Sequence, residues 1–330
     1  MNISGDNIIL YKDANIEISK TKEYRITGEK IVEMFENHKK TFSYYFAEYE
    51  LYTHYDILTI FQKNNIIWYD NNLINYNLAQ KLNIPKYSMI EKCAYVQTIW
   101  TVNYYHFLID ELPNIIKINQ FNKDLPILCN YNDTYIKEIL DLFNFSNELI
   151  KPKNNLGIKI KECILTNMAI SGKPSKTELL LIRNYLIKEK KIEFNQMNLG
   201  IIIKRKEQER KVLNFDLIVE HLINKFKDIE WIVFDSLSFK DSVKLFSKSK
   251  YIIAPHGAGL TNMLFAPPEC NIIEFMPYSD PNECYCHLAN MLDHNYNCIV
   301  VNDTGKQNGK QMTIQLEYLD KIMNSLNYCT

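Results

Sequence analysis

The length of the chain, 330 residues, exceeds the size at which a single hydrophobic core stops growing, and it therefore predicts two domains. A hydrophobic fraction of 46% is that of a globular protein, and a formal net charge of −1 argues against nucleic acid or an anionic membrane as a general electrostatic partner. No run of 18 apolar residues predicts a transmembrane helix, and the first residues lack the pattern of a secretory signal. Eight scattered cysteines then favour reduced thiols in a cytoplasmic protein, whether free or peripheral to a membrane.

The first ninety residues favour short strands. Strands are expected at Asn7–Tyr11, Ile16–Ser19 and Glu23–Ile26, which are separated by polar turns. Tyr55–Phe61 and Ile66–Tyr69 are typical of a hairpin, because two apolar runs flank a polar turn. This part of the chain is therefore predicted to be rich in β-structure.

A helical pattern begins at Asn103, after a strand expected at Ala94–Thr101. His106 and Asp110 are four residues apart, so a helix places them on one face. A carboxylate that holds an imidazole in one tautomer prepares it for general-base catalysis, which makes this pair a candidate catalytic site. The alternative is structural, because a lone histidine near the start of a helix is more often part of the fold.

The domain boundary is predicted in the basic, polar stretch Lys188–Asn198. The helix before it begins at Ser175, which forms a capping box with Glu178. We therefore expect an N-terminal domain at residues 1–195 and a C-terminal domain at residues 196–330.

From residue 199 onward, apolar strands and amphipathic helices alternate regularly. Such alternation predicts a parallel, doubly wound sheet with helices on both faces. Strands are expected at Gly200–Lys204, Trp231–Phe234, Tyr251–Ala254, Asn271–Phe275 and Cys298–Val301. Helices are expected at Asn214–Phe226, Phe239–Ser247, Leu260–Phe265, 282–293 and Thr313–Leu326.

The stretch Tyr251–Pro277 carries the most specific pattern of the chain. Pro255 ends its first strand, and the loop His256–Gly259 follows, in which glycine permits positive φ and close approach to a ligand. A strand, a glycine loop and a helix N-terminus together suit an anion such as phosphate, through backbone amides and the helix dipole. The spacing is neither GxGxxG nor that of a P-loop. The stretch thus predicts an anion site of unusual type.

Two arginines form a second candidate group. Arg205 and Arg210 lie just beyond the strand expected at Gly200–Lys204, at the strand end where open α/β sheets bind ligands. Each guanidinium can donate forked hydrogen bonds to phosphate oxygens. The alternative is a solvated run of charges without a ligand.

Two further polar residues have more than one possible role. His256 either contacts a phosphate or sugar, or closes its own loop by a hydrogen bond. Glu274, on a strand expected to be buried, needs hydrogen-bond donors, which either a ligand's ribose hydroxyls or the protein itself can supply.

No metal site is expected. The run Cys284-Tyr285-Cys286-His287 lacks the spacing of zinc ligands. No Asp-x-Asp pair occurs that could hold a cation against a diphosphate. The charge of a bound diphosphate would have to be met by arginines, His256 and backbone amides.

These motifs resemble glycosyltransferase family 61, whose members include capsular polysaccharide biosynthesis proteins. The resemblance covers residues from about 94 to 280. It rests on the runs Asn103–Pro113, Arg205…Arg210…Asn214, Ser236-Leu237-Ser238-Phe239, His256-Gly257-Ala258-Gly259-Leu260-Thr261-Asn262 and Ile273-Glu274, and on Pro277.

The resemblance implies a GT-B architecture, in which two Rossmann-like, doubly wound domains face each other across a cleft and the C-terminal one binds the donor. It implies an inverting, metal-independent transfer from a nucleotide sugar, a UDP-sugar, to a glycan or surface-polysaccharide acceptor, with no cofactor. By the match, His106 or Asp110 deprotonates the acceptor and Glu274 lies near the nucleoside. The residues that hold the donor diphosphate are Arg205, Arg210, His256, Gly257, Ala258, Gly259 and Leu260.

Two other classes of function remain open at this point. The same scaffold could carry a sugar-nucleotide epimerase or hydrolase, because one fold hosts many chemistries. It could also be a non-catalytic glycan- or nucleotide-binding protein. The donor sugar, the acceptor and the oligomeric state cannot be read from the sequence.

Overall fold

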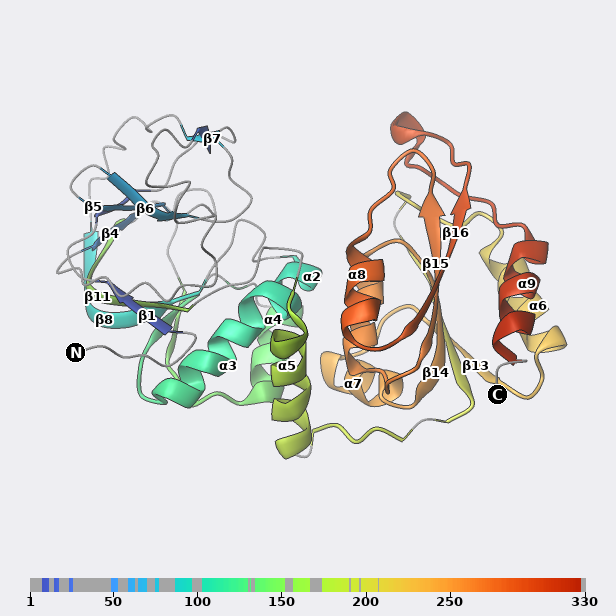
Figure 1. Ribbon diagram of the computed structural model, residues 1–330, viewed down its shortest axis with the longest axis horizontal. Coiled ribbons are helices and arrows are strands. Elements are labelled where there is room, and N and C mark those ends of the chain that lie inside the picture. The colour runs from blue at the N-terminus through green and yellow to red at the C-terminus, as the bar shows by residue number, and fades with distance from the viewer. Residues whose placement is uncertain are drawn as a thin grey trace. The chain divides into compact units, whose positions relative to one another are not determined.

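The computed structural model divides into two compact units, Met1–Pro174 and Ser175–Thr330 (unit 1 and unit 2; Figure 1). We describe each unit by itself. The structure describes residues 8–11, 15–17, 24–25, 49–52, 59–62, 65–69, 75–76, 87–96, 103–129, 131, 134–151, 157–166, 174–189, 191–195, 197–206 and 208–327.

Unit 1 is built on a six-stranded sheet of mixed direction. Its strands are β1 (Ile8–Tyr11), β4 (Tyr49–Tyr52), β8 (Tyr87–Tyr95), β9 (Ile127–Leu128), β10 (Leu149–Ile150) and β11 (Gly157–Thr166). The order is β1-β11-β8-β9-β10, with β4 also paired to β11. The pairs among β8, β9, β10 and β11 are parallel, whereas β1 and β4 run antiparallel to β11.

Two small antiparallel sheets complete the strands of unit 1. One contains β2 (Asn15–Glu17), β5 (Thr59–Gln62) and β6 (Asn65–Tyr69), and the other β3 (Tyr24–Arg25) and β7 (Asn75–Tyr76). The pairing of β5 with β6 confirms the predicted hairpin. Some predicted parts lie outside the described residues. These are the turn of the hairpin, most residues that flank β2 and β3, and residues 97–101 of the strand expected at Ala94–Thr101.

The helical pattern after Asn103 forms one continuous helical stretch with a π-helical segment in it. The amide of Tyr105 donates to Oδ1 of Asn103, 3.0 Å away, which caps the start of the helix. In order, the segments are α2 (Tyr104–His106), the π-helix η1 (Phe107–Glu111) and α3 (Leu112–Phe121). A separate helix, α4 (Tyr135–Phe143), follows β9. Wider turns of the π type are frequent at functional sites.

Unit 2 contains a fully parallel, five-stranded sheet, as predicted. Its strands are β12 (Leu199–Ile203), β13 (Glu230–Phe234), β14 (Ser249–Pro255), β15 (Asn271–Pro277) and β16 (Asn295–Val301). The order is β13-β12-β14-β15-β16, so the chain first steps outward from β12 to β13 and then returns across β12 to β14. The point between β12 and β14, where the winding reverses, is where such sheets bind ligands.

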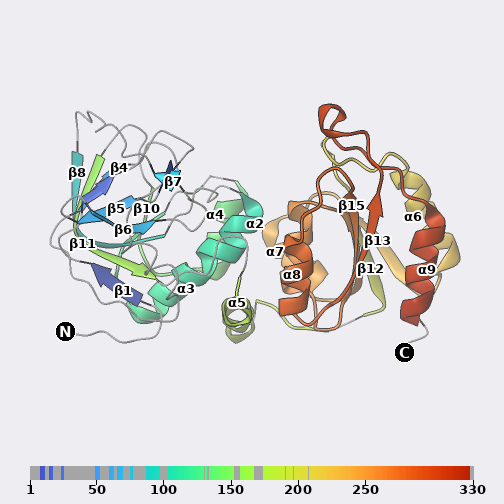
Figure 2. The same ribbon diagram turned by 45° about the horizontal axis from the view of Figure 1, so that its top comes forward.

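Helices cover both faces of this sheet, with α6 and α9 on one side and α7 and α8 on the other (Figures 1 and 2). The helical segments are α5 (Lys176–Lys188), α6 (Phe215–Lys225), α7 (Phe239–Phe246), η2 (Ala258–Phe265), α8 (Cys284–Met291), η3 (Lys306–Asn308) and α9 (Leu316–Asn327). A core of buried apolar side chains joins α6 and α9 to the sheet, and it includes Ile202, Ile218, Leu222, Ile253, Ile273, Phe275, Leu319 and Met323.

Two features of unit 2 differ from the prediction: the type of one helix and the position at which the unit begins. The helix expected at Leu260–Phe265 is the 3-10 helix η2, in which Leu260 N–H donates to the carbonyl of Gly257 at 3.0 Å. Helix α5, whose predicted capping box of Ser175 and Glu178 is confirmed, is grouped with unit 2. The units therefore divide at residues 174/175, whereas the sequence placed the domain boundary at 195/196. Within the described residues, no helix is both long and apolar enough to cross a membrane.

Candidate functional site

The winding reversal of unit 2 brings two predicted residues together. Arg205 follows the end of β12, and His256 follows the end of β14, the neighbouring parallel strand. Nη1 of Arg205 lies 3.4 Å from the carbonyl oxygen of His256 and donates to it. The carboxyl ends of β12 and β14 therefore bring an arginine and a histidine into contact.

Close approach explains the glycine at position 257. Gly257 has φ 161°, which is extended backbone, so the expected positive φ is not what requires a glycine here. A Cβ atom at this position would instead collide with the guanidinium of Arg205. At Gly259, a Cβ would come to 3.0 Å from Cγ2 of Ile203, on β12. The two glycines let the loop lie tightly against the end of β12.

Leu260 takes a structural place in this loop. Its side chain is fully buried, and its amide is engaged by the Gly257 carbonyl. The amides that could meet an anion are therefore those of Gly257, Ala258 and Gly259, and we do not carry Leu260 into the proposed ligand site.

His256 belongs to a buried hydrogen-bonded row that runs across three strands. Its Nδ1 contacts Oε1 of Glu274, on β15, and Oε2 of Glu274 accepts from the hydroxyl of Tyr296, on β16, at 2.5 Å. Burial and the adjacent Glu274 carboxylate raise the pKa of Tyr296 above its ordinary value, so its hydroxyl remains a donor. The ring of Tyr285 packs edge-on against His256, with centroids 5.0 Å apart.

This row resolves the two roles that the sequence left open for Glu274. The side chain is fully buried and both of its oxygens contact protein groups. Because a carboxylate accepts the hydrogen bond, Nδ1 of His256 carries the proton and Nε2 is left as the acceptor of the ring. Glu274 thus fixes the tautomer of His256.

The C-terminal segment fixes the loop that carries Arg210. The amide of Arg210 donates to the carbonyl of Gly309 at 2.5 Å, and Val212 forms a parallel bridge with Met312. The side chain of Asn214 both donates to and accepts from the backbone of Ile314, at 2.8 and 3.0 Å. Residues about a hundred positions apart therefore hold this loop in place.

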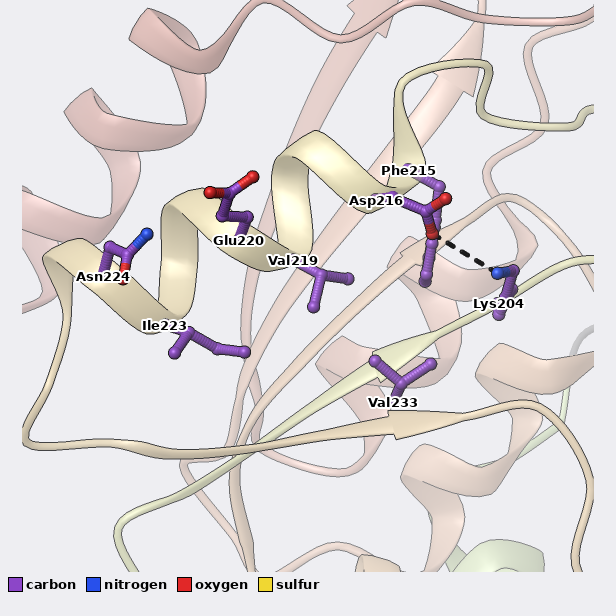
Figure 3. Close-up of a pocket in the computed structure, with 8 residues that line it drawn as sticks. All are labelled: Lys204, Phe215, Asp216, Val219, Glu220, Ile223, Asn224 and Val233. Atoms are coloured by element: carbon purple, nitrogen blue, oxygen red, sulfur yellow. Dashed lines mark hydrogen bonds and ion pairs between the residues drawn. The ribbon is translucent and has the colours of Figure 1, made fainter.

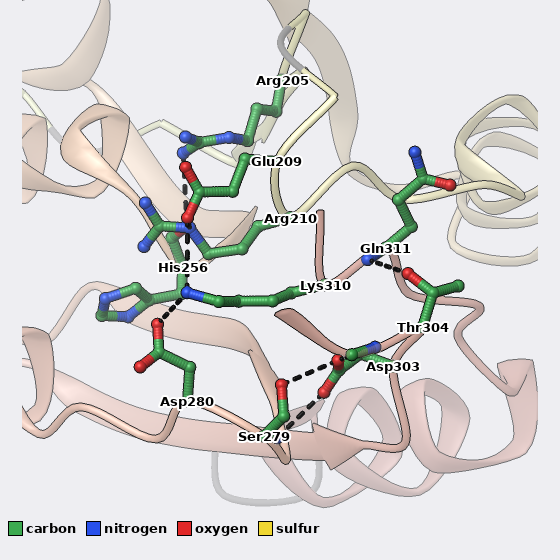
Figure 4. A network of polar contacts seen from close by, with 11 residues as sticks. Arg205, Glu209, Arg210, His256, Ser279, Asp280, Asp303, Thr304, Lys310 and Gln311 are labelled. Atoms are coloured by element: carbon green, nitrogen blue, oxygen red, sulfur yellow. Dashed lines mark hydrogen bonds and ion pairs between the residues drawn. The ribbon is translucent and has the colours of Figure 1, made fainter. Parts of the chain in front are cut away.

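An ion-pair network surrounds Arg210 (Figure 4). Nζ of Lys310 lies 2.5 Å from Oδ2 of Asp280 and 3.4 Å from Oε1 of Glu209, and the same Glu209 oxygen lies 3.9 Å from Nε of Arg210. The side chain of Ser279 is bonded to Asp303, which ties the segment after β15 to the segment before Lys310. Sequence reasoning found the arginines but missed Lys310, because it lies in a polar turn without a local motif.

Helix α5 secures the far end of the glycine-loop helix. Arg183 donates to the carbonyl oxygens of Leu264 and Ala266, both at 2.8 Å, close to the end of η2. Nε2 of His294 lies 3.0 Å from the carbonyl oxygen of Met263. The carbonyls that a short helix leaves without internal partners are thus met by side chains from two other elements.

In unit 1, the structure brings His106 and Asp110 together, as predicted. Nδ1 of His106 lies 2.7 Å from Oδ2 of Asp110, across the junction of α2 and the π-helix η1. The side chain of Asp110 is 3% exposed and that of His106 is 21% exposed. The imidazole is therefore the more exposed member of the pair, and its Nδ1 is engaged by the buried carboxylate.

A separate groove of about 370 Å³ lies between α6 and the edge strand β13 (Figure 3). Its floor is apolar, formed by Val219, Ile223 and Val233, and the ion pair of Lys204 with Asp216, 3.4 Å long, closes one end. None of the predicted site residues lines this groove.

The cysteines near the site are poor candidates for thiolate chemistry. Burial raises the pKa of Cys284 to about 12, and that of Cys298 to about 11. Among the residues that the structure describes, no group of three or more metal-ligating side chains lies close enough together to hold an ion.

Comparison with known proteins identifies the family. The chain matches glycosyltransferase 61 over residues 104–273, just over half of its length. It belongs to this family. The matched part includes the segments that carry His106 and Arg210, and the loop after His256, and it ends one residue before Glu274.

Among curated proteins, a stretch of 90 residues is 33% identical to the EGF domain-specific O-linked N-acetylglucosamine transferase of Drosophila melanogaster. That stretch covers 27% of this chain and 17% of the relative. Lys310, Asp280 and Tyr296 lie C-terminal to the family match.

Proposed function

We propose that the protein is a glycosyltransferase that moves a sugar from a nucleotide sugar, a UDP-sugar, to a glycan acceptor. Membership of the glycosyltransferase 61 family supports the class of reaction. The observation that carries the proposal is the contact of Arg205 with His256 at the winding reversal of a parallel sheet, where such sheets bind nucleotides. Arg210 lies beside this pair (Figure 4).

The proposed donor site lies at the carboxyl edge of the sheet of unit 2. Arg205 and Arg210 hold the diphosphate by charge-assisted hydrogen bonds, and the amides of residues 257–259 add donors. His256 contacts the donor through Nε2, and Glu274 keeps that ring in its tautomer. In this proposal the protein's own cations neutralise the developing charge, so the transfer is independent of metal ions.

The proposed transfer inverts the anomeric carbon. A base removes the proton of the acceptor hydroxyl, whose oxygen forms the new bond to the anomeric carbon. The bond between that carbon and the diphosphate oxygen breaks, and its electron pair leaves with the nucleoside diphosphate. We assign the base to His106, because its side chain is more exposed than that of Asp110, and we assign Asp110 the role of holding Nδ1.

The proposal is tested with the full-length protein and a panel of nucleotide sugars. We expect a UDP-sugar to raise the melting temperature, and its cleavage to proceed in EDTA when a glycan acceptor is present. Arg210→Ala should weaken UDP binding by about 1.5–3 kcal/mol in calorimetry, the range for charge-assisted hydrogen bonds. Lys227→Ala, an exposed lysine of the same unit, is the charge-matched control.

Three outcomes contradict the proposal in different ways. Unchanged UDP affinity in Arg210→Ala removes the arginine from the site. Tight UDP binding without turnover of any donor indicates a non-catalytic nucleotide-binding protein. Loss of all transfer in EDTA, restored by a divalent cation, rejects metal independence.

A further inference from the structure

Lys310 occupies an unusual position for a lysine. It lies on the turn between η3 and α9, in the left-handed region with φ 51°, and its amide donates to the carbonyl of Gly305 at 3.0 Å. Its side chain is only 14% exposed, although it carries a charge. The turn is fixed to the loop of Arg210 by the backbone bond from Arg210 to Gly309. The backbone therefore delivers this ammonium group to the predicted donor site.

The two acids that pair with Lys310 are much more exposed than the lysine. Asp280 is 42% exposed and Glu209 is 51% exposed. Exposed carboxylates gain little from such pairs, because water solvates them well in the unpaired state. The Lys310 side chain is less exposed, so its ammonium group gains more from an anionic partner than the two acids gain from the lysine. When another anion replaces the acids at Lys310, we therefore expect the acids and not the lysine to move.

One oxygen atom shows where an incoming anion would sit. Oε1 of Glu209 lies between the two cations, 3.4 Å from Nζ of Lys310 and 3.9 Å from Nε of Arg210 (Figure 4). Nε of Arg210 is buried and has no hydrogen-bond partner among the described residues. A single anionic oxygen with better geometry can therefore contact both cations, as a phosphate oxygen does.

We propose that Lys310 is a third phosphate-binding cation of the donor site, and that Asp280 and Glu209 are displaceable counter-ions which neutralise it when the site holds no diphosphate. The inference rests on the proposed function and adds a residue that lies outside the family match. The hydrogen bond to Asp280 raises the pKa of Lys310 above its usual value, so the ammonium is charged throughout the neutral range.

The charges around the site explain why the acids must move. Arg205, Arg210 and Lys310 provide three positive charges, and Asp280 and Glu209 provide two negative ones. A diphosphate brings at least two further negative charges, so it binds well only when the carboxylates point into water. Removing the charge of Asp280 should therefore favour the ligand, whereas removing that of Lys310 should oppose it.

The test measures binding of UDP, and of pyrophosphate as a probe without a base, to the full-length protein in EDTA. Lys310→Met should weaken both by about tenfold to a hundredfold, and Lys310→Arg should restore most of the affinity. Asp280→Asn should tighten UDP binding by about twofold to fivefold. Uridine, which lacks phosphate, should bind equally to all variants, and Lys227→Met serves as the control.

A purely structural ion pair predicts a different pattern. In that case both Lys310→Met and Asp280→Asn lower the melting temperature and both weaken UDP binding. If the Lys310→Met variant folds and binds UDP within twofold of wild type, the inference about Lys310 is wrong. The proposed donor site of Arg205, Arg210 and His256 is not affected by that result. If Lys310→Met does not fold, weaker UDP binding by Asp280→Asn overturns it. A wild-type protein that binds neither UDP nor pyrophosphate rejects the proposed function, and this inference with it.

Discussion

The contact between His256 and Glu274 shows how a single residue's role depends on its neighbours in space. Adjacent parallel strands place the two side chains together, and Tyr296 on the next strand completes the row. A buried carboxylate is costly unless donors surround it, and here the donors come from the protein. The row therefore orients the ring of His256 and leaves Glu274 with no exposed surface.

The second histidine–carboxylate pair leads to a prediction about catalysis. His106→Gln should lower sugar transfer by about a hundredfold to ten-thousandfold and leave UDP affinity unchanged, because only the general base is lost. Asp110→Asn should also lower transfer, since an amide no longer fixes the proton on Nδ1 of His106. Initial rates with saturating donor, together with calorimetry of UDP, measure both quantities.

Another pair in the same chain provides the matched control. Nε2 of His221 lies 2.7 Å from Oδ1 of Asp320, joining α6 to α9 away from the proposed site. His221→Gln should leave turnover unchanged. A His106→Gln enzyme that transfers sugar at a rate within threefold of wild type would exclude His106 as the base.

At the scale of elements, the 3-10 helix η2 illustrates what a local pattern can and cannot predict. Its place after the glycine loop and before Pro267 was evident from the sequence, since proline disfavours helical backbone in the residue before it. Its helix type was not, because the end of η2 is held by Arg183 and His294, which lie far away in the chain. The regular strands and helices after residue 199 were predictable from periodicity, because each is amphipathic or fully buried on its own.

The packing of η2 also predicts how acid affects stability. Burial lowers the pKa of His294 to about 4, from a usual value of about 6.5. As the pH falls from 6.5 to 4, the unfolded chain binds a proton at this residue and the folded protein does not. The stabilisation is therefore complete above pH 6.5 and is lost as the pH approaches 4, by about 3 kcal/mol.

His294→Gln isolates this contribution. Glutamine can still donate to the carbonyl of Met263 but does not titrate. Urea unfolding at a series of pH values from 7.5 to 4 should show a shallower loss of stability in the variant than in the wild type. Parallel curves for the two proteins would show that folding does not change the pKa of His294.

At the scale of the whole molecule, the sequence predicted the parallel sheet of unit 2 and the segments that meet at the ends of β12 and β14, because those residues lie within contiguous motifs. It did not predict Lys310 or Asp280, whose positions depend on the pairing of the loop at 208–214 with the segment at 309–314. Such pairing joins residues about a hundred positions apart, and no local periodicity records it. In the proposed donor site, residues after the family match therefore join those within it.

The division of the chain gives the last prediction. Residues 175–330 contain the parallel sheet, its core and Arg183, so this fragment should unfold in one cooperative transition and bind UDP within a few-fold of the full-length protein. It should not transfer sugar, because His106 is absent.

A fragment of residues 196–330 begins at the boundary expected from the sequence but lacks α5. It loses the two bonds from Arg183 to Leu264 and Ala266, and should be less stable by about 3 kcal/mol or more. Equal urea midpoints for the two fragments would show that α5 does not stabilise unit 2.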